Sequence, residues 1–193
     1  MAERWSVRPA SEAGLEAVAT VFGNRGPASV CHCQRYQLAP RESFGKLGVD
    51  ELAFRFRNEL ADEPGPGLVG FIDGEPVAWC AVRPRSEYAG LRRFHQVPWQ
   101  GRDENRADPS VWAITCFTTR AGHRRRGYAS RLVFTAVDHA RASGARVLEG
   151  YPMLTTAALT EELHVGTLGM FTRAGFTELI SPTKRRAVVR IDL

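Results

Sequence analysis

"VWAITCFTT" at residues 111–119 is rich in β-branched and aromatic residues, which predicts a β-strand. The next stretch, "RAGHRRRGYAS" at 120–130, places three adjacent arginines and a glycine before small residues. Apolar residues then recur at helical spacing, at Leu132, Val133, Ala136, Val137 and Ala140. "RVLEGY" at 146–151 predicts another strand. This order of strand, turn, helix and strand predicts two parallel strands joined by a helix.

The arginine-rich turn stands where a helix begins, and a helix start favours an anion. It presents free N–H groups and the positive end of the helix dipole. Gly127 lets the backbone approach a ligand, and the arginines can donate charge-assisted hydrogen bonds to phosphate oxygens. The turn therefore predicts a phosphate site. A solvated charge run and a nucleic-acid patch are the alternatives at this point.

The rest of the chain predicts an alternation of strands and helices. "WSVRPA" at 5–10 indicates a short strand, and Ser11 can cap a first helix. Asp50 can cap a second helix. Two apolar runs around Asp73-Gly74 predict a β-hairpin, because this dipeptide accepts the positive φ angles of a tight turn. Residues 83–110 predict a long loop with a short helix at 86–94, and two closing strands follow a weak late helix.

Length and composition indicate one globular domain over residues 1–193. The chain is 44% hydrophobic and 24% charged, with a net charge of +5 that suits an anionic ligand or a nucleic acid equally. No apolar run reaches the roughly 20 residues of a membrane span. The start, "MAERWSVRPA", lacks the apolar stretch of a signal peptide. We therefore expect a cytoplasmic protein.

The four cysteines, at 31, 33, 80 and 116, predict reduced thiols. In "CHC" at 31–33 a single residue separates the pair, a poor spacing for a disulfide or a zinc site. We expect no bound metal.

The run Arg124-Arg125-Arg126-Gly127-Tyr128-Ala129 resembles the motif Arg/Gln-x-x-Gly-x-Gly/Ala of the GNAT superfamily of N-acyltransferases. "MFTRAGF" at 170–176 resembles the family's late segment, and the order of elements extends the resemblance over nearly the whole chain. The resemblance implies an α/β fold with a mixed, mostly antiparallel sheet flanked by helices and a parallel strand pair around the CoA-binding helix. It also implies transfer of an acetyl group from acetyl-CoA to a primary amine of a small molecule or peptide, by direct attack in a ternary complex.

The same resemblance implies which residues bind acetyl-CoA. The turn's N–H groups and arginines would hold the pyrophosphate, and the edges of Phe117 and Thr119 would pair with the pantetheine arm. The N–H of Phe117 would stabilise the oxyanion of the thioester. The expected CoA-binding residues are Phe117, Thr118, Thr119, Arg124, Arg125, Arg126, Gly127, Tyr128, Ala129, Ser130, His164 and Phe171.

The sequence departs from the family pattern at both proton-transfer positions. Phe171 stands where members often carry a tyrosine that protonates the leaving thiolate, and it has no proton to give. The motif strand holds no carboxylate, which leaves Glu149 on the neighbouring strand as the candidate general base. The alternative for Glu149 is a strand-end carboxylate paired with an arginine. Cys116 adjoins the thioester position, where a small buried side chain is expected.

By analogy, the acceptor site is lined by the segment between the first two helices and by the 83–110 loop. This region holds "CHCQRYQL" at 31–38 and "RRFHQVPWQ" at 92–100, with Tyr36, Trp99 and Trp112 nearby in sequence. We expect a small-molecule or peptide amine as partner, no nucleic acid and no membrane, and we leave a homodimer open. Two other functions stay open. One is an acyl-CoA sensor without catalysis. The other is a basic nucleic-acid module, which would spread its arginines over one surface.

Overall fold

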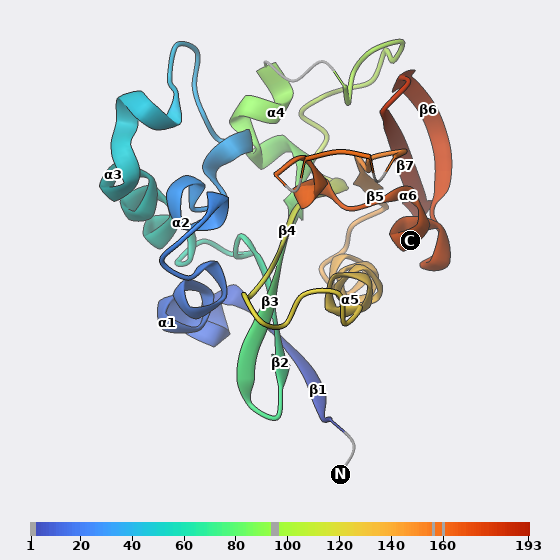
Figure 1. Cartoon of the computed structure of the whole chain (residues 1–193). Coiled ribbons are helices and arrows are strands. Elements are labelled where there is room, and N and C mark those ends of the chain that lie inside the picture. Colours follow the sequence, from blue (N-terminus) through green and yellow to red (C-terminus); the bar gives the residue numbers. More distant parts are fainter. Residues whose placement is uncertain (1–2, 94–96, 156, 160) are drawn as a thin grey trace.

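The structure is a computed structural model that describes residues 3–93, 97–155, 157–159 and 161–193 (Figure 1). Within these residues seven strands form one sheet in the order β1-β2-β3-β4-β5-β7-β6. They are β1 (Trp5–Pro9), β2 (Gly67–Ile72), β3 (Glu75–Pro84), β4 (Val111–Thr119), β5 (Val147–Gly150), β6 (Thr177–Thr183) and β7 (Arg186–Asp192). Neighbouring strands are antiparallel except β4 and β5, which are parallel. This confirms the predicted fold class.

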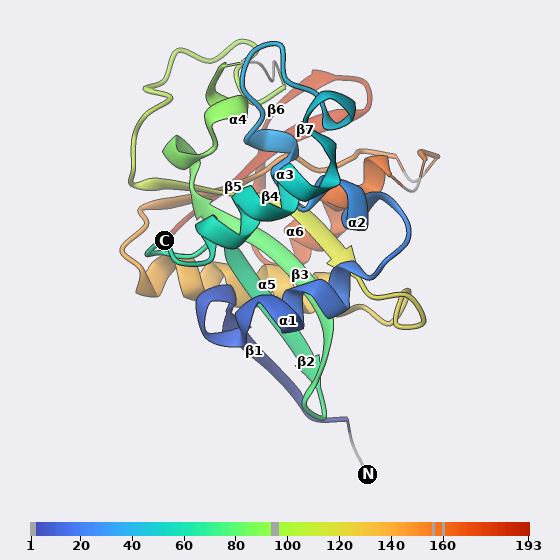
Figure 2. The same ribbon diagram turned by 90° about the vertical axis from the view of Figure 1, so that its left-hand side faces the viewer.

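Helices cover both faces of the sheet (Figures 1 and 2). One face carries α1 (Ala10–Phe22), α2 (Pro27–Cys31) and α3 (Phe44–Glu59), and the other carries α5 (Tyr128–Ala142) and α6 (Leu168–Arg173). α4 (Ala89–Arg93) and three single turns, η1 (Gln34–Tyr36), η2 (Arg85–Glu87) and η3 (Glu162–Val165), lie in the connections. No helix in the described part of the chain combines the length and apolar character needed to cross a membrane.

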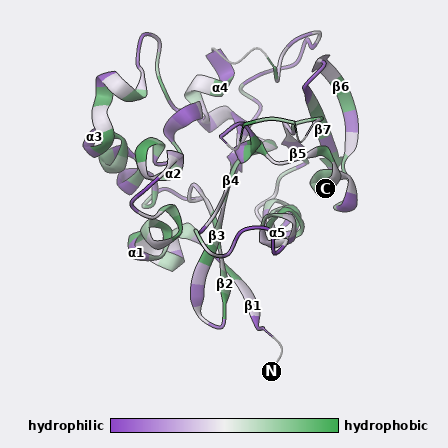
Figure 3. Cartoon of the chain, in the orientation of Figure 1, coloured by the Kyte–Doolittle hydropathy of each residue, from purple (hydrophilic) through white to green (hydrophobic). Residues whose placement is uncertain are grey.

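The predicted unit of strand, turn, helix and strand is confirmed as β4, α5 and β5. The five apolar side chains predicted for one face of α5 are all buried against the sheet. Figure 3 shows the turn between β4 and α5 as a hydrophilic segment. The hairpin is confirmed too, because Asp73 and Gly74 adopt positive φ angles of 49° and 89° between β2 and β3.

Two predicted helix starts are wrong. α1 begins directly after Pro9, so Ser11 lies inside the helix and does not cap it. α3 begins at Phe44, and Ser43 caps it by accepting a hydrogen bond from the N–H of Lys46 at 3.3 Å. Asp50 lies within this helix, beyond a kink at Gly48 where φ is 77°. Gly48 leaves the helical conformation, with φ of 77° and ψ of 163°, so the helical stretch that carries Asp50 starts again directly after this glycine.

The end of β4 has a strand neighbour on one side only. β5 ends at Gly150, which pairs with Ile114, whereas the pairing with β3 continues to Thr119. A bulge in the pairing with β3 leaves Thr115 as an extra residue at the point where β5 ends. Bulges re-aim the residues that follow them. Residues 115–119 therefore have no strand partner on the side where β5 would lie if it were longer, and their backbone edge is open there.

Candidate active site

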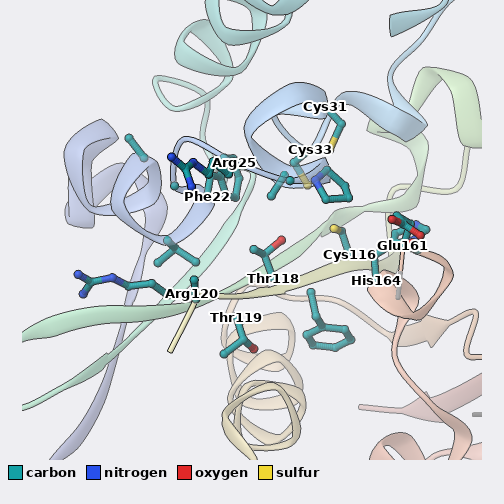
Figure 4. A pocket seen from close by; sticks show the side chains of 18 of the residues that line it. Phe22, Arg25, Cys31, Cys33, Cys116, Thr118, Thr119, Arg120, Glu161 and His164 are labelled. Carbon is teal, nitrogen blue, oxygen red and sulfur yellow. The ribbon is translucent and has the colours of Figure 1, made fainter. Parts of the chain in front are cut away.

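A cavity of about 1080 Å³ opens beside this open edge of β4 (Figure 4). Its walls are the end of α1 and the loop after it, α2 and the segment after α2, the last residues of β4, and η3. Four arginines and two glutamates line it, together with apolar and sulfur-bearing side chains. The excess of arginines favours an anionic ligand.

The end of β4 contributes Cys116, Phe117, Thr118 and Thr119 to the cavity wall. Side chains alternate along a strand, so Cys116 and Thr118 point toward α2 while Thr119 points toward the opposite face (Figure 4). The open backbone edge and a set of small side chains thus face the same space. Such an edge can pair with an extended, amide-bearing ligand as another strand would.

The arginine-rich turn reaches the cavity through Arg124, which also donates a hydrogen bond from Nε to the carbonyl oxygen of Thr119 at 3.4 Å. Gly127 is the N-cap of α5, with φ of 80°, and a β-carbon there would meet no atom within 4 Å. The positive φ angle therefore favours glycine at position 127, and a steric clash of a side chain is not the reason. Arg131 makes the first bond of the helix, to the carbonyl of Gly127, so the N–H groups of the preceding turn lie outside the helical ladder.

The cavity is not lined by Arg125, Arg126, Tyr128, Ala129 or Ser130. Arg125 has a positive φ of 63°, and Arg126 is exposed and lies 3.8 Å from the carboxylate of Glu3. Tyr128 is buried and stacks on Trp5 with ring centroids 5.6 Å apart. Ala129 is half-buried, and Ser130 accepts a hydrogen bond from Arg173 at 3.2 Å. Their side chains build the helix start, and their N–H groups remain at its open end.

His164 and Phe171 take different places. His164 lies in η3 on the cavity wall, with Nδ1 2.6 Å from the carbonyl oxygen of Glu161. Phe171 is fully buried and does not line the cavity. Its ring packs edge-on against Phe117 and Phe176, at 6.1 and 5.2 Å between centroids. Phe171 therefore supports the strand end from the α6 side.

Glu149 lies at the centre of a buried ion cluster. Its carboxylate accepts hydrogen bonds from Arg85 at 3.0 Å, from Arg102 and Arg190 at 2.5 Å, and from the hydroxyl of Tyr151 at 3.0 Å. Burial by itself would raise the pKa of Glu149. The positive charges of Arg85 and Arg102 and the hydrogen bonds outweigh burial and lower this pKa.

This environment determines what Glu149 can do. The side chain is fully buried, does not line the cavity, and holds its charge against three arginines. A lowered pKa makes a carboxylate a weak proton acceptor. The geometry therefore fits a Glu149 that pairs with arginines at the strand end better than a Glu149 that acts as general base.

Only part of the expected acceptor region reaches the cavity. Tyr36 and Cys33 line it, whereas Trp99 and Trp112 do not. Trp99 is buried with its Nε1–H donating to the carbonyl of Leu91 at 2.8 Å, and the guanidinium of Arg85 lies 4.7 Å from its ring centroid. Residues 94–96 of the expected stretch "RRFHQVPWQ" lie outside the described residues.

Sequence reasoning missed three arginines on the cavity wall: Arg25, Arg35 and Arg120. Arg120 directly follows β4 and begins the arginine-rich turn, so its place in sequence was a signal that it lies on the cavity wall. Arg25 and Arg35 flank α2 in stretches without a clear pattern, and only folding brings them to the cavity beside β4. The thiols of Cys31, Cys33, Cys80 and Cys116 are free, and no group of three His, Cys, Asp or Glu side chains in the described ranges could hold a metal ion.

In this structure β4 loses its parallel neighbour β5 after Ile114, and a helix start that carries arginines follows β4. This arrangement is typical of proteins that use acyl-CoA. The chain belongs to the acetyltransferase (GNAT) family, whose sequence pattern it matches over residues 33–176. Acyl transfer from CoA is the chemistry of this family.

Solved structures show the same fold at low sequence identity. An N-acetyltransferase from Staphylococcus aureus Mu50 is 16% identical, with a TM-score of 0.54 and 98% of each chain covered. The PaiA N-acetyltransferase from Thermoplasma acidophilum, in complex with coenzyme A, is 9% identical, with a TM-score of 0.55 and coverage of 98% of this chain and 99% of that one. The NatC complex bound to Gag peptide and CoA contains a chain that is 12% identical, with a TM-score of 0.53 and coverage of 98% and 99%. No protein of curated function matches this chain in sequence.

Proposed function

We propose that this protein, as one domain over residues 1–193, transfers the acetyl group of acetyl-CoA to a primary amine of a small molecule or peptide. One observation carries the proposal: the open edge of β4 and Arg124 of the arginine-rich turn line the same cavity. A CoA molecule needs both an anchor for its pyrophosphate and an edge for its amide-bearing arm.

In this proposal the chain's own groups hold the donor at two points. The N–H groups at the start of α5 bind the pyrophosphate together with Arg124, and Arg120 adds positive charge at the same end of the cavity. The edge of residues 117–119 pairs with the pantetheine arm. The N–H of Phe117 donates to the thioester oxygen and stabilises the negative charge that develops there during attack.

The acceptor amine enters from the side of α2 and η3. Arg35, Tyr36, Glu161 and His164 line that part of the wall. The neutral amine attacks the thioester carbon in a ternary complex, and we propose that the amine proton passes to water because Glu149 lies off the cavity wall. A peptide acceptor is included because a chain of the same fold occurs in a complex with a peptide and CoA.

A second function is favoured by a specific pair of observations. Phe171 is buried and offers no proton, and the Glu149 carboxylate is occupied by arginines. A protein with this site could bind acyl-CoA as a sensor and release no product.

The test follows CoA thiol release from acetyl-CoA, with and without a panel of primary amines that includes polyamines, amino acids and short peptides. The proposal expects release that depends on at least one amine, with mass spectrometry finding that amine acetylated. Binding of acetyl-CoA without amine-dependent release across the panel would favour the sensor. Replacing acetyl-CoA by longer acyl-CoA donors tests the acetyl assignment.

A further inference from the structure

Two thiols face each other in the cavity beside the predicted position of the thioester. Cys33 extends from the segment after α2, and Cys116 extends from β4 into the same space (Figure 4). Cys116 directly precedes Phe117 and is only 9% exposed. The proposed reaction leaves these thiols without a role.

Trp79 and Cys116 both interact with the Cys33 thiol. The indole Nε1–H of Trp79 donates to Sγ of Cys33 at 3.3 Å, and this group can only donate. Cys116 interacts with the same thiol from the side of β4. Cys33 is therefore held between Trp79 and Cys116. The hydrogen bond to Cys116, together with burial, raises the pKa of Cys33 well above its usual value, so Cys33 keeps its proton.

The backbone that presents Cys33 is strained. His32 and Cys33 are consecutive non-glycine residues in the left-handed region, with φ of 42° and 60°. Such conformations are unfavourable for residues with a β-carbon and concentrate at functional sites. Here they turn the chain at the end of α2 so that the Cys33 thiol meets β4.

The proposed reaction requires a proton donor that the late helix does not supply. When the amine displaces CoA, sulfur leaves as a thiolate, and the buried Phe171 cannot protonate it. A cysteine thiol has a pKa close to that of a leaving alkyl thiol, so proton transfer between two sulfurs is nearly balanced in energy. A donor of this kind must lie beside the thioester, where Cys116 stands next to Phe117.

We propose that Cys116 is the general acid that protonates the departing thiolate of CoA, with Cys33 and Trp79 as positioning residues. This inference rests on the proposed function. The amine nitrogen forms a bond to the thioester carbon, and the carbon–sulfur bond breaks with its electron pair going to sulfur. The proton moves from Sγ of Cys116 to that sulfur. The Cys116 thiolate then accepts the Cys33 hydrogen bond, and it recovers a proton from water as the amide nitrogen releases one to water.

Other titratable groups face Cys116 from the packed elements. They are Cys33 after α2, Tyr36 in η1 and, across the cavity, His164 in η3. Tyr36 is the competing donor. Burial raises the pKa of its phenol, and the Arg186 guanidinium, which contacts the phenol, partly opposes that effect. Tyr36 packs in the buried cluster with Tyr88 and Met153, whereas Phe117 belongs to the cluster that packs against α5.

The decisive experiment compares acetyl-CoA turnover in wild type, Cys116→Ala and Cys80→Ala. Cys80 is a matched buried cysteine that pairs with Phe117 from β3 and packs in the core on the α5 side. Cys116→Ala should lower kcat on the order of 10²-fold while keeping CoA affinity. Cys80→Ala should keep kcat. An aryl thioester donor, whose thiolate leaves without protonation, should react equally with wild type and Cys116→Ala.

An alkylation measurement tests the thiol pair. At a fixed pH, iodoacetamide should alkylate Cys116 faster in Cys33→Ala than in wild type, because the variant removes the thiol that lies beside Cys116 in the cavity. This alkylation needs no turnover, so it tests the thiol pair even if no amine is acetylated.

Several results would overturn the proposal. One is an unchanged kcat in Cys116→Ala, and another is a full loss of kcat in Tyr36→Phe with Cys116→Ala active. A third is an acetyl group found on Cys116 by mass spectrometry as a kinetically competent intermediate. The fourth is a rate of Cys116 alkylation that Cys33→Ala leaves unchanged. If wild type binds CoA and acetylates no amine, the proposed function fails, and the catalytic assignment of Cys116 fails with it. The rate of Cys116 alkylation in wild type and Cys33→Ala then decides separately whether the two thiols are in contact.

Discussion

Replacing Glu149 by glutamine tests whether the buried ion cluster anchors Arg85 and Arg102 to the sheet. The Glu149→Gln change keeps the shape of the side chain and removes its charge. Arg85, which is fully buried, and Arg102 would lose the carboxylate that lies 3.0 and 2.5 Å from them. Removing one partner of a buried pair typically costs about 3–5 kcal/mol, because the remaining charge stays buried. For a chain of this size the Tm should fall on the order of 10 °C.

The assay is thermal and urea unfolding, with Glu42→Gln as the matched control. Glu42 pairs with Arg55 at 2.9 Å near the surface, where an ion pair contributes about 1 kcal/mol or less. The pKa of Glu149 is lowered in the folded protein, so its contribution is present above the unfolded pKa of about 4.3 and is lost as pH falls through the folded pKa. The stability difference between wild type and Glu149→Gln should therefore shrink in acid below about pH 4. A Tm equal to that of wild type at pH 7 would refute the reasoning.

The same variant separates anchoring from catalysis. With the protein held well below its Tm, an anchoring role predicts kcat close to that of wild type. A fall in kcat on the order of 10² or more with CoA affinity kept would instead identify Glu149 as the general base.

Two further substitutions test backbone and packing. Gly127→Ala should lower the free energy of unfolding by about 1–2 kcal/mol, because φ at Gly127 is 80°, whereas Gly45→Ala inside α3 should not destabilise, and urea titration measures both. Destabilisation by Gly45→Ala equal to that by Gly127→Ala would count against the conformational argument. Phe171→Tyr should lower stability by about 1–3 kcal/mol and leave kcat no higher, because the ring is fully buried against Gly150 and the new hydroxyl is enclosed. A gain in kcat would mean that the hydroxyl reaches the leaving thiolate.

The unit from β4 to β5 could be predicted from sequence because its signals are local. Strand composition, helical spacing in α5 and the arginine-rich turn each occupy neighbouring residues, and the structure has them in the predicted places. The hairpin at Asp73-Gly74 follows from the same kind of local rule. The helix start at Ser43 was also a local signal, but the kink at Gly48 made the second half of α3 look like the whole helix.

The cavity and its charges could not be predicted in the same way, because they depend on contacts between distant segments. Glu149 meets Arg85 and Arg102, 64 and 47 residues away in sequence. Trp79 meets Cys33 across 46 residues. Nothing in the local pattern of "LEGY" or "CHC" says which partner folding will bring to it.

The most direct test of the central claim, that this cavity binds CoA through the arginine turn, is calorimetric titration of CoA into wild type and Arg124→Ala. Loss of a charge-assisted hydrogen bond should weaken binding by about 1.5–3 kcal/mol. Dephospho-CoA, which keeps the pyrophosphate, should lose affinity to the same extent, and pantetheine, which lacks it, should bind both proteins alike. Arg141→Ala, at the exposed far end of α5, should bind CoA as wild type does. Equal effects of Arg124→Ala on CoA and pantetheine, or no effect on either, would contradict the account.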